Sequence, residues 1–230
     1  MRKGLPKNGQ QPYDRIDSGV KGGGSVNEKY FSLPEERQKA ILRAGYRVFA
    51  KNSYKHSPMQ EVADEAGISK SLLFHYFRNK KELYLFLLDA GAKLTIEHLT
   101  SYGCYEQEDL FEAMYVGMRA KADVMRRYPN MTAFVLKAYY EQDEEVRGEV
   151  QKVIAKYVDF RANAYLVNLS PEQFVPGLDL KMMYLEMLWA SEGYLWEKVQ
   201  WGRLDVDALE KDFVRMIDFW KSIYLRKEKS

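Results

Sequence analysis

A short stretch in the N-terminal half of the chain carries side chains that could bind nucleic acid. Lysine donates to guanine, serine to several bases, and leucine contacts a thymine methyl group. These three types are adjacent at Lys70, Ser71 and Leu72. Basic and hydroxyl side chains suited to phosphate lie nearby at Lys55, His75, Tyr76, Lys80 and Lys81. Taken singly, each has a plainer explanation as surface or core, so the hypothesis depends on their combination.

Helix-start signals divide this stretch into two short helices. Ser57 precedes Pro58, and Gln60 follows three residues after Ser57, which is the pattern of a capping box. Gly67 favours the left-handed conformation just past a helix end, and Ser69 caps the next helix. Two helices joined by so tight a turn predict a helix-turn-helix, whose second helix enters the major groove. Ser57 and Ser69 therefore join the candidate DNA-contacting residues.

Helical periodicity continues on both sides of this unit. We expect a first helix over about Pro34 to Asn52 with Ser32 as its N-cap, and a fourth helix capped by Asn79. Apolar spacing and breaks at proline and glycine predict five later helices. Their expected ranges are Glu108 to Arg127, Asn130 to Tyr140, Asp143 to Val167, Leu180 to Gln200 and Val206 to Leu225.

Residues Leu33 to about Leu94 closely resemble the DNA-binding domain of the TetR family of bacterial transcriptional repressors. The likeness runs through AILRAGYRVFAKNSY, SPMQEVADEAGISKSLLFHYF and NKKEL. It implies that Gly67 makes the turn. Residues facing bases would be Lys70, Ser71 and Leu72, and residues reaching phosphates would be His75, Tyr76 and Lys80. Phe74 and Pro58 depart from the pattern, since the family commonly has tyrosine at the first position and serine or threonine at the second.

The predicted fold class is all-α, with about nine helices in total. An N-terminal three-helix helix-turn-helix domain, residues 31–80, precedes a larger helical domain for ligand binding and dimerisation, residues 81–230. Residues 1–30 contain six glycines and no apolar periodicity, so we expect a disordered leader that is partly an expression tag. Net charge is +3 for residues 1–30, +4 for residues 31–95 and −5 for residues 96–230, which favours an anionic partner for the N-terminal part.

The last two predicted helices carry more apolar surface than one core needs. In the resembled family such helices form a four-helix interface between two chains, and small residues would allow close approach. The predicted interface comprises Met187, Ala190, Ser191, Gly193, Tyr194, Phe213, Met216, Ile217 and Trp220. The alternative is a single-chain bundle that buries the same faces.

Aromatic and methionine side chains in the second domain suggest a pocket for a hydrophobic small-molecule effector, because methionine adapts to irregular shapes. The candidate lining is Tyr102, Phe111, Tyr115, Met118, Phe134, Tyr139, Phe160 and Trp189. Plain core packing would also explain such stripes. The acidic run Glu141 to Glu149 is better explained as a solvated helix start than as a site for a cationic ligand.

Catalysis has little support in the sequence. His56, His75 and His98 lack metal-site spacing, and Cys104 has no histidine near it in sequence, so we expect no catalytic residues, no metal and no cofactor. One cysteine and no stretch of roughly 18 apolar residues favour a cytoplasmic protein without a membrane partner.

The predicted function is a sequence-specific transcriptional regulator. As the resemblance implies, a homodimer would hold double-stranded DNA at a palindromic operator and repress transcription, and an effector would release it by moving the fourth helix. The alternative is a DNA-binding protein without an inducer, with an architectural or partner-recruiting role.

Overall fold

The computed structural model describes residues 26–166, 169–202 and 204–226, and these residues form α-helices joined by turns. In chain order the helices are α1 (Glu28–Phe31), α2 (Glu35–Lys51), α3 (Met59–Glu65), α4 (Lys70–Tyr76), α5 (Lys80–Ser101), α6 (Leu110–Arg127), α7 (Pro129–Tyr139), α8 (Arg147–Leu166), α9 (Leu180–Gln200) and α10 (Val206–Tyr224). Short 3-10 helices occur at Cys104–Glu106 and Pro171–Gln173. No strand forms in the described ranges, which confirms the all-α class.

Local hydrogen bonds explain where the central helices begin. Ser69 Oγ accepts the Leu72 amide at 3.1 Å, and Asn79 Oδ1 accepts the Glu82 amide at 2.9 Å, as their positions predicted. Gly67 has φ of 65° at the turn between α3 and α4, where a residue with a Cβ would be strained.

Two predicted caps are wrong. α2 begins after Pro34 with no side-chain cap, because the Ser32 hydroxyl donates to the Lys29 carbonyl at the end of α1. α3 begins after Pro58, also without a side-chain cap, because the Ser57 hydroxyl donates back to the Ser53 carbonyl at 2.8 Å. In both places a serine bonds to the preceding turn instead of the following helix.

The short helix α1 was not predicted, since residues 26–30 fell within the expected disordered leader; residues 1–25 of that leader lie outside the described residues. The Asn27 amide donates to the Tyr76 carbonyl at 2.9 Å, and Asn27 Nδ2 donates to the His75 carbonyl at 3.2 Å. The Tyr30 ring is 1% exposed and lies 5.0 Å from the Phe77 ring, measured between centroids. This segment therefore binds the carbonyl end of α4.

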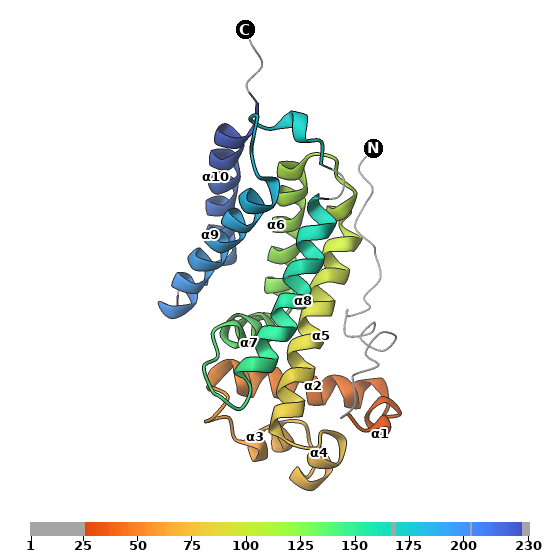
Figure 1. Ribbon diagram of the computed structural model, residues 1–230. Coiled ribbons are helices and arrows are strands. Elements are labelled where there is room, and N and C mark those ends of the chain that lie inside the picture. The colour runs from red at the N-terminus through yellow and green to blue at the C-terminus, as the bar shows by residue number, and fades with distance from the viewer. Residues whose placement is uncertain (1–25, 167–168, 203, 227–230) are drawn as a thin grey trace.

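Figure 1 shows an elongated molecule in which α2, α3 and α4 occupy one end, with α1 beside them. Helix α5, with 22 residues and a length of about 33 Å at 1.5 Å per residue, leaves this end and runs beside α6 and α8. Helices α9 and α10 lie along one side of the other end. Helix α5 is thus the segment through which the chain leaves the helix-turn-helix end.

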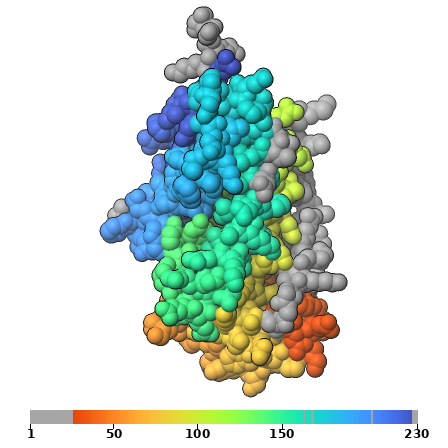
Figure 2. Space-filling view, in the orientation of Figure 1, coloured from red at the N-terminus to blue at the C-terminus, as the bar shows by residue number. Residues whose placement is uncertain are grey.

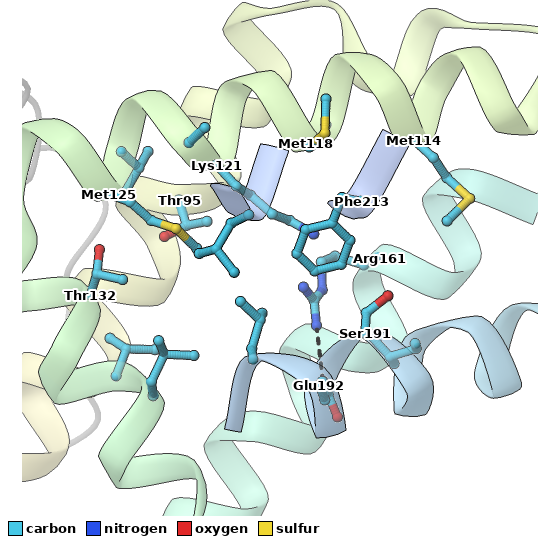
Figure 3. A pocket seen from close by; sticks show the side chains of 18 of the residues that line it. Thr95, Met114, Met118, Lys121, Met125, Thr132, Arg161, Ser191, Glu192 and Phe213 are labelled. Atoms are coloured by element: carbon cyan, nitrogen blue, oxygen red, sulfur yellow. Dashed lines mark ion pairs between the residues drawn. The ribbon is translucent and has the colours of Figure 1, made fainter. Parts of the chain in front are cut away.

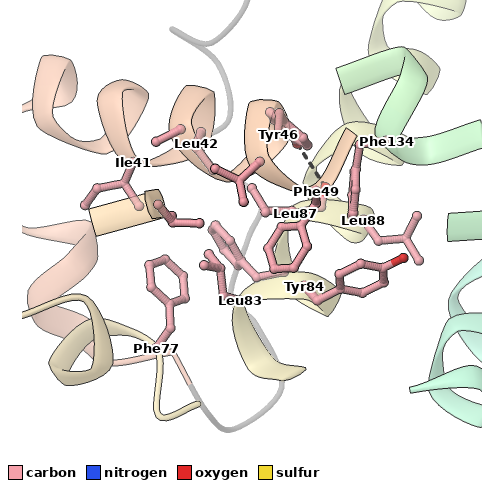
Figure 4. Close-up of a cluster of buried hydrophobic side chains, with 14 of the residues drawn as sticks. Ile41, Leu42, Tyr46, Phe49, Phe77, Leu83, Tyr84, Leu87, Leu88 and Phe134 are labelled. Atoms are coloured by element: carbon pink, nitrogen blue, oxygen red, sulfur yellow. Dashed lines mark hydrogen bonds between the residues drawn. The ribbon is translucent and has the colours of Figure 1, made fainter. Parts of the chain in front are cut away.

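The apolar core forms two clusters. The first joins α2 to α5 and α7 around Phe49, Tyr84 and Phe134 (Figure 4), and the Tyr46 hydroxyl donates to the Leu87 carbonyl within it at 2.9 Å. The second surrounds Phe111 and joins α6 to α8, α9 and α10. Because α7 and the start of α8 belong to the first cluster, the later helices help to bury the helix-turn-helix end.

Candidate functional site

The first turn of α4 presents a group of side chains to solvent. Ser69, Lys70 and Ser71 are exposed, the Leu72 residue is 36% exposed, and His75 is exposed one turn later. Leu73, in the same helix, is completely buried and holds α4 against the core. The predicted base-facing residues therefore share one exposed helix end, with hydrogen-bond donors and one apolar side chain available there.

Two residues predicted to contact DNA have little exposed surface. Ser57 is 3% exposed, and its hydroxyl is used by the Ser53 carbonyl. Tyr76 is 7% exposed, with its ring 6.3 Å from the Tyr30 ring between centroids. The structure corrects the prediction for Ser57, because its hydroxyl faces the preceding turn. Tyr76 packs its ring against α1 and also lines the groove beside Ser69 and Leu72, so its contact with a phosphate stays a prediction.

The remaining predicted cations lie at the start of α5 and before α3. Lys55 is exposed, whereas Lys80 Nζ donates to the Lys55 carbonyl at 3.0 Å and lies 4.9 Å from the centroid of the Tyr54 ring. Partial burial lowers the pKa of Lys80, and nearby acidic residues oppose that change. Lys80 therefore fixes the loop that carries Lys55.

Sequence reasoning missed Arg37 on α2. This exposed arginine helps to line a small groove with Gly67, Ser69 and Leu72, and its Nη1 atom would lie 3.8 Å from a Cβ placed on Gly67. Arg37 and the buried Ile41 stand four residues apart on α2, but no local pattern indicates that this face adjoins the turn before α4.

A second candidate site is a cavity of about 260 Å³ between α6, α7, α8, α9 and α10 (Figure 3). Methionine, leucine and valine side chains supply most of its apolar lining, including Met114, Met118, Met125 and Leu188. Of the predicted pocket residues, Met118 and Tyr139 line it.

The other six predicted pocket residues do not line this cavity. Phe111 and Phe134 are completely buried in the two core clusters, whereas Phe160 and Trp189 are 47% and 55% exposed. Tyr102 packs beside His98, and the Tyr115 hydroxyl donates to Asp218. Helical spacing identified large side chains correctly but could not distinguish core, cavity and surface positions.

Charged groups gather at one end of the cavity, as Figure 3 shows. Arg161 Nη2 lies 4.0 Å from Glu192 Oε1, and the Tyr139 hydroxyl donates to the other carboxylate oxygen. Burial raises the pKa of Glu192, although Tyr139 and the two nearby cations oppose this. Burial, reinforced by Arg161, lowers the pKa of Lys121 to about 8.

Helix α7 connects the cavity to the helix-turn-helix end. Tyr139, in its last turn, binds Glu192 in the cavity, and two residues later Glu141 Oε2 accepts the Tyr54 amide at 3.0 Å. Lys137 Nζ also donates to the Lys51 carbonyl at 3.2 Å. In Figure 2 the green surface that includes α7 lies directly against the orange surface of the helix-turn-helix end.

Helices α9 and α10 expose large apolar side chains together. Met182 and Trp189 on α9 are 53% and 55% exposed, and Phe219 and Ile223 on α10 are 61% and 46% exposed. The two helices are joined by the Tyr224 hydroxyl, which donates to Glu186 at 3.1 Å.

The predicted interface set divides between surface and interior. Met187, Ile217 and Trp220 are at most 4% exposed, and Ser191, Phe213, Met187 and Ile217 line the cavity. The structure corrects Met187, Ile217 and Trp220, since they face the chain's own interior. Ser191 and Phe213 line the cavity but are partly exposed, so they stay predicted interface residues. Gly193 is exposed, and Ala190, Tyr194 and Met216 are partly exposed, so these four remain predicted interface residues.

The described residues form neither a metal centre nor a membrane span. No group of three or more histidine, cysteine, aspartate or glutamate side chains is arranged there to hold a metal ion. In the same ranges no helix combines the length and hydropathy needed to cross a membrane.

Comparisons with known proteins agree on one family. Residues 41–86 match the model of bacterial regulatory proteins, tetR family. The chain is 41% identical over 63 residues to the HTH-type transcriptional activator FasR of Mycolicibacterium smegmatis, a match that covers 27% of this chain and 29% of that protein. The matches to FasR, to the regulator YerO of Bacillus subtilis and to the regulator RutR of Escherichia coli span 29%, 60% and 43% of the lengths of those proteins. The chain therefore covers less than two thirds of each.

Solved structures share the fold over most of the chain. The fatty acid degradation regulator FadR from Bacillus halodurans superimposes with a TM-score of 0.67 at 16% identity, covering 79% of this chain and 94% of that chain. AibR, solved with isovaleryl coenzyme A and operator DNA, has a TM-score of 0.61 at 23% identity and covers 78% of this chain and 97% of that chain. At these identities the likeness concerns the fold alone.

Proposed function

Because this chain belongs to the TetR family of bacterial regulatory proteins, we propose that it is a sequence-specific DNA-binding transcriptional regulator controlled by a small molecule. The observation that carries the proposal is the exposed first turn of α4, with Lys70, Ser71 and Leu72 outward and Leu73 buried. This arrangement supports insertion of α4 into the major groove. Exposed Arg37, which shares a groove with Ser69 and Leu72, and exposed Lys55, which precedes α3, are suited to the phosphates that set the register.

Dimerisation would use the exposed faces of α9 and α10. Met182, Trp189, Phe219 and Ile223 form apolar surface that a soluble monomer would leave in water, and a second copy of the chain would cover it. A two-fold axis there would place two α4 helices on one DNA duplex, so the operator would be palindromic.

Ligand control would pass through α7 and α5. A ligand in the cavity contacts the side chains that position Tyr139, and Glu141 two residues later holds the loop at Tyr54. Lys81 on α5 pairs with Glu149 on α8 at 3.0 Å, which is a second connection. The ligand would shift the separation of the two α4 helices only by its preference for one of the two states.

In the proposed mechanism the dimer represses transcription from its operator, and the ligand releases it. The cavity supports this mechanism over an architectural protein without an effector. Transcription from the selected operator, measured with and without the protein, distinguishes repression from activation, which is the role stated for the transcriptional activator FasR.

The decisive experiment selects bound sequences from a random duplex pool and then measures affinity against salt concentration. A palindrome with steep salt dependence is the expected result. Leu72→Ala should change the selected base at one position in each half-site, at a cost of about 1–3 kcal/mol there. Folded protein that enriches no sequence would contradict the proposal.

A phosphate contact is tested separately. Lys55→Ala should weaken binding to selected and random DNA equally and lower the salt slope by about one. Lys152→Ala, which removes the same charge from an exposed position on α8, is the matched control. Equal losses from both variants would refute the assignment of Lys55 to phosphate binding.

A further inference from the structure

At the charged end of the cavity, two positively charged side chains face one negatively charged side chain. Lys121 on α6 and Arg161 on α8 both extend toward it, and Glu192 on α9 is the carboxylate beside them (Figure 3). Glu210, the other carboxylate in the lining, pairs with Arg126 instead. Two cations therefore share one carboxylate, which also accepts the Tyr139 hydroxyl.

The donors of both cations are incompletely used. Arg161 Nη2 is 4.0 Å from Glu192, too far for a hydrogen bond, and Arg161 Nε is buried without a hydrogen-bond partner among the described residues. Lys121 makes no hydrogen bond or ion pair in the described part of the chain. A buried donor without a partner, such as Arg161 Nε, costs free energy, and an anion placed between Arg161 and Lys121 would accept hydrogen bonds from both.

The other walls of the cavity are mainly apolar, with Thr95, Thr132 and Ser191 as uncharged polar residues among them. Met114, Met118, Met125 and Leu188 supply apolar surface there, and Glu210, the further charged residue of the lining, is paired with Arg126. A volume of about 260 Å³ accommodates on the order of ten non-hydrogen atoms, at roughly the 30 Å³ that each water molecule occupies in the liquid. Such a space fits a ligand with one small charged group and a short apolar chain or ring.

We propose that the cavity binds a small amphipathic carboxylic acid, with its carboxylate between Lys121 and Arg161 and its apolar part against the methionine wall. Guanidinium and ammonium groups bind carboxylates through charge-assisted hydrogen bonds, and the flexible methionines accommodate different chain shapes. This inference rests on the proposed ligand control and names the chemical class of that ligand.

Octanoate, which has ten non-hydrogen atoms, is the probe, and calorimetry at pH 7 measures its binding. 1-Octanol and octylamine keep the chain and replace the anion with a neutral and a cationic group. Octanoate should bind at least about tenfold more tightly than either, the difference that one charge-assisted hydrogen bond supplies. Equal or tighter binding of 1-octanol or octylamine, or no octanoate binding to folded protein, would overturn the inference.

Variants test the assigned residue. Lys121→Met should weaken octanoate binding by about tenfold or more and leave 1-octanol binding unchanged, while Lys121→Arg should retain most of the octanoate affinity. Lys152→Met removes one charge at an exposed position outside the cavity and should have no effect. Equal losses from Lys121→Met and Lys152→Met would overturn the inference, and the ligand series on unaltered protein tests it even if a variant fails to fold.

A DNA release assay separates this inference from the proposed function. Octanoate binding without release of the selected operator would preserve the ligand class and contradict ligand control. Release by neutral or cationic chains, with no preference for octanoate, would preserve ligand control and contradict the ligand class.

Discussion

Glu141 offers a direct test of the connection between the cavity and the helix-turn-helix. Its Oε2 atom accepts the partly buried Tyr54 amide at 3.0 Å, while Oε1 accepts the amides of Gln142 and Asp143, also at 3.0 Å each. The bond to Tyr54 joins segments 87 residues apart, whereas the other two are local and can be replaced by water. Glu141→Ala removes this bond and leaves the cavity lining and the exposed first turn of α4 unaltered.

The expected stability loss follows from that one long-range bond. A hydrogen bond to a charged group contributes about 1.5–3 kcal/mol. With a slope of about 3 kcal/mol per molar urea, the unfolding midpoint should fall by roughly 0.5–1 M. Glu141→Gln keeps an acceptor oxygen but loses the charge, so its loss should be about half as large. All samples must have the same protein concentration, because the proposed dimerisation would contribute to stability.

The functional readout is the ratio of operator affinities without and with octanoate. If α7 transmits the effect of the ligand, Glu141→Ala should reduce the coupling free energy between ligand and operator. A reduction of about 1.4 kcal/mol would lower the affinity ratio about tenfold, toward one. Glu144→Ala, an exposed change in the same segment, is the control and should stay within about 0.5 kcal/mol of the unaltered protein. Indistinguishable behaviour of the two alanine variants in both assays would refute the reasoning.

Four further predictions follow from packing and charge. Tyr30→Ala should lower the free energy of unfolding by about 3–5 kcal/mol in urea titrations, because a completely enclosed ring leaves a cavity. Gly67→Ala should cost about 1–2 kcal/mol in the same titration, because φ is 65° there; no measurable loss would contradict the left-handed turn. Burial and Arg161 lower the pKa of Lys121 from 10.5 to about 8, so the cost of its charge is fully present below pH 8 and disappears as pH approaches 10.5. Lys121→Met should therefore raise the Tm more at pH 7 than at pH 10 in calorimetry. Trp189→Glu should convert a dimer to a monomer in light scattering, because it places a charge on the exposed apolar face of α9; an unchanged mass would contradict that interface.

Local signals in the sequence were sufficient for several elements. Ser69, Asn79 and Gly67 act on bonds and dihedral angles within a few residues, and each does what its position predicted. The limits of α9 agree with the prediction at both ends for the same reason, since Asp179 caps it and Gly202 follows it with a positive φ. All-α architecture and the outward first turn of α4 were therefore accessible from sequence alone.

Only the tertiary structure decided which large side chains face which environment. Phe134 fills a core, Trp189 lies on the surface and Phe213 lines the cavity, although all three occur in similar helical patterns. Local spacing describes the face of one helix and not the neighbour that covers it, which depends on segments far apart in the chain. Lys121 and Arg161 meet for that reason, because α6 and α8 pack against the same cavity and no short-range pattern joins them.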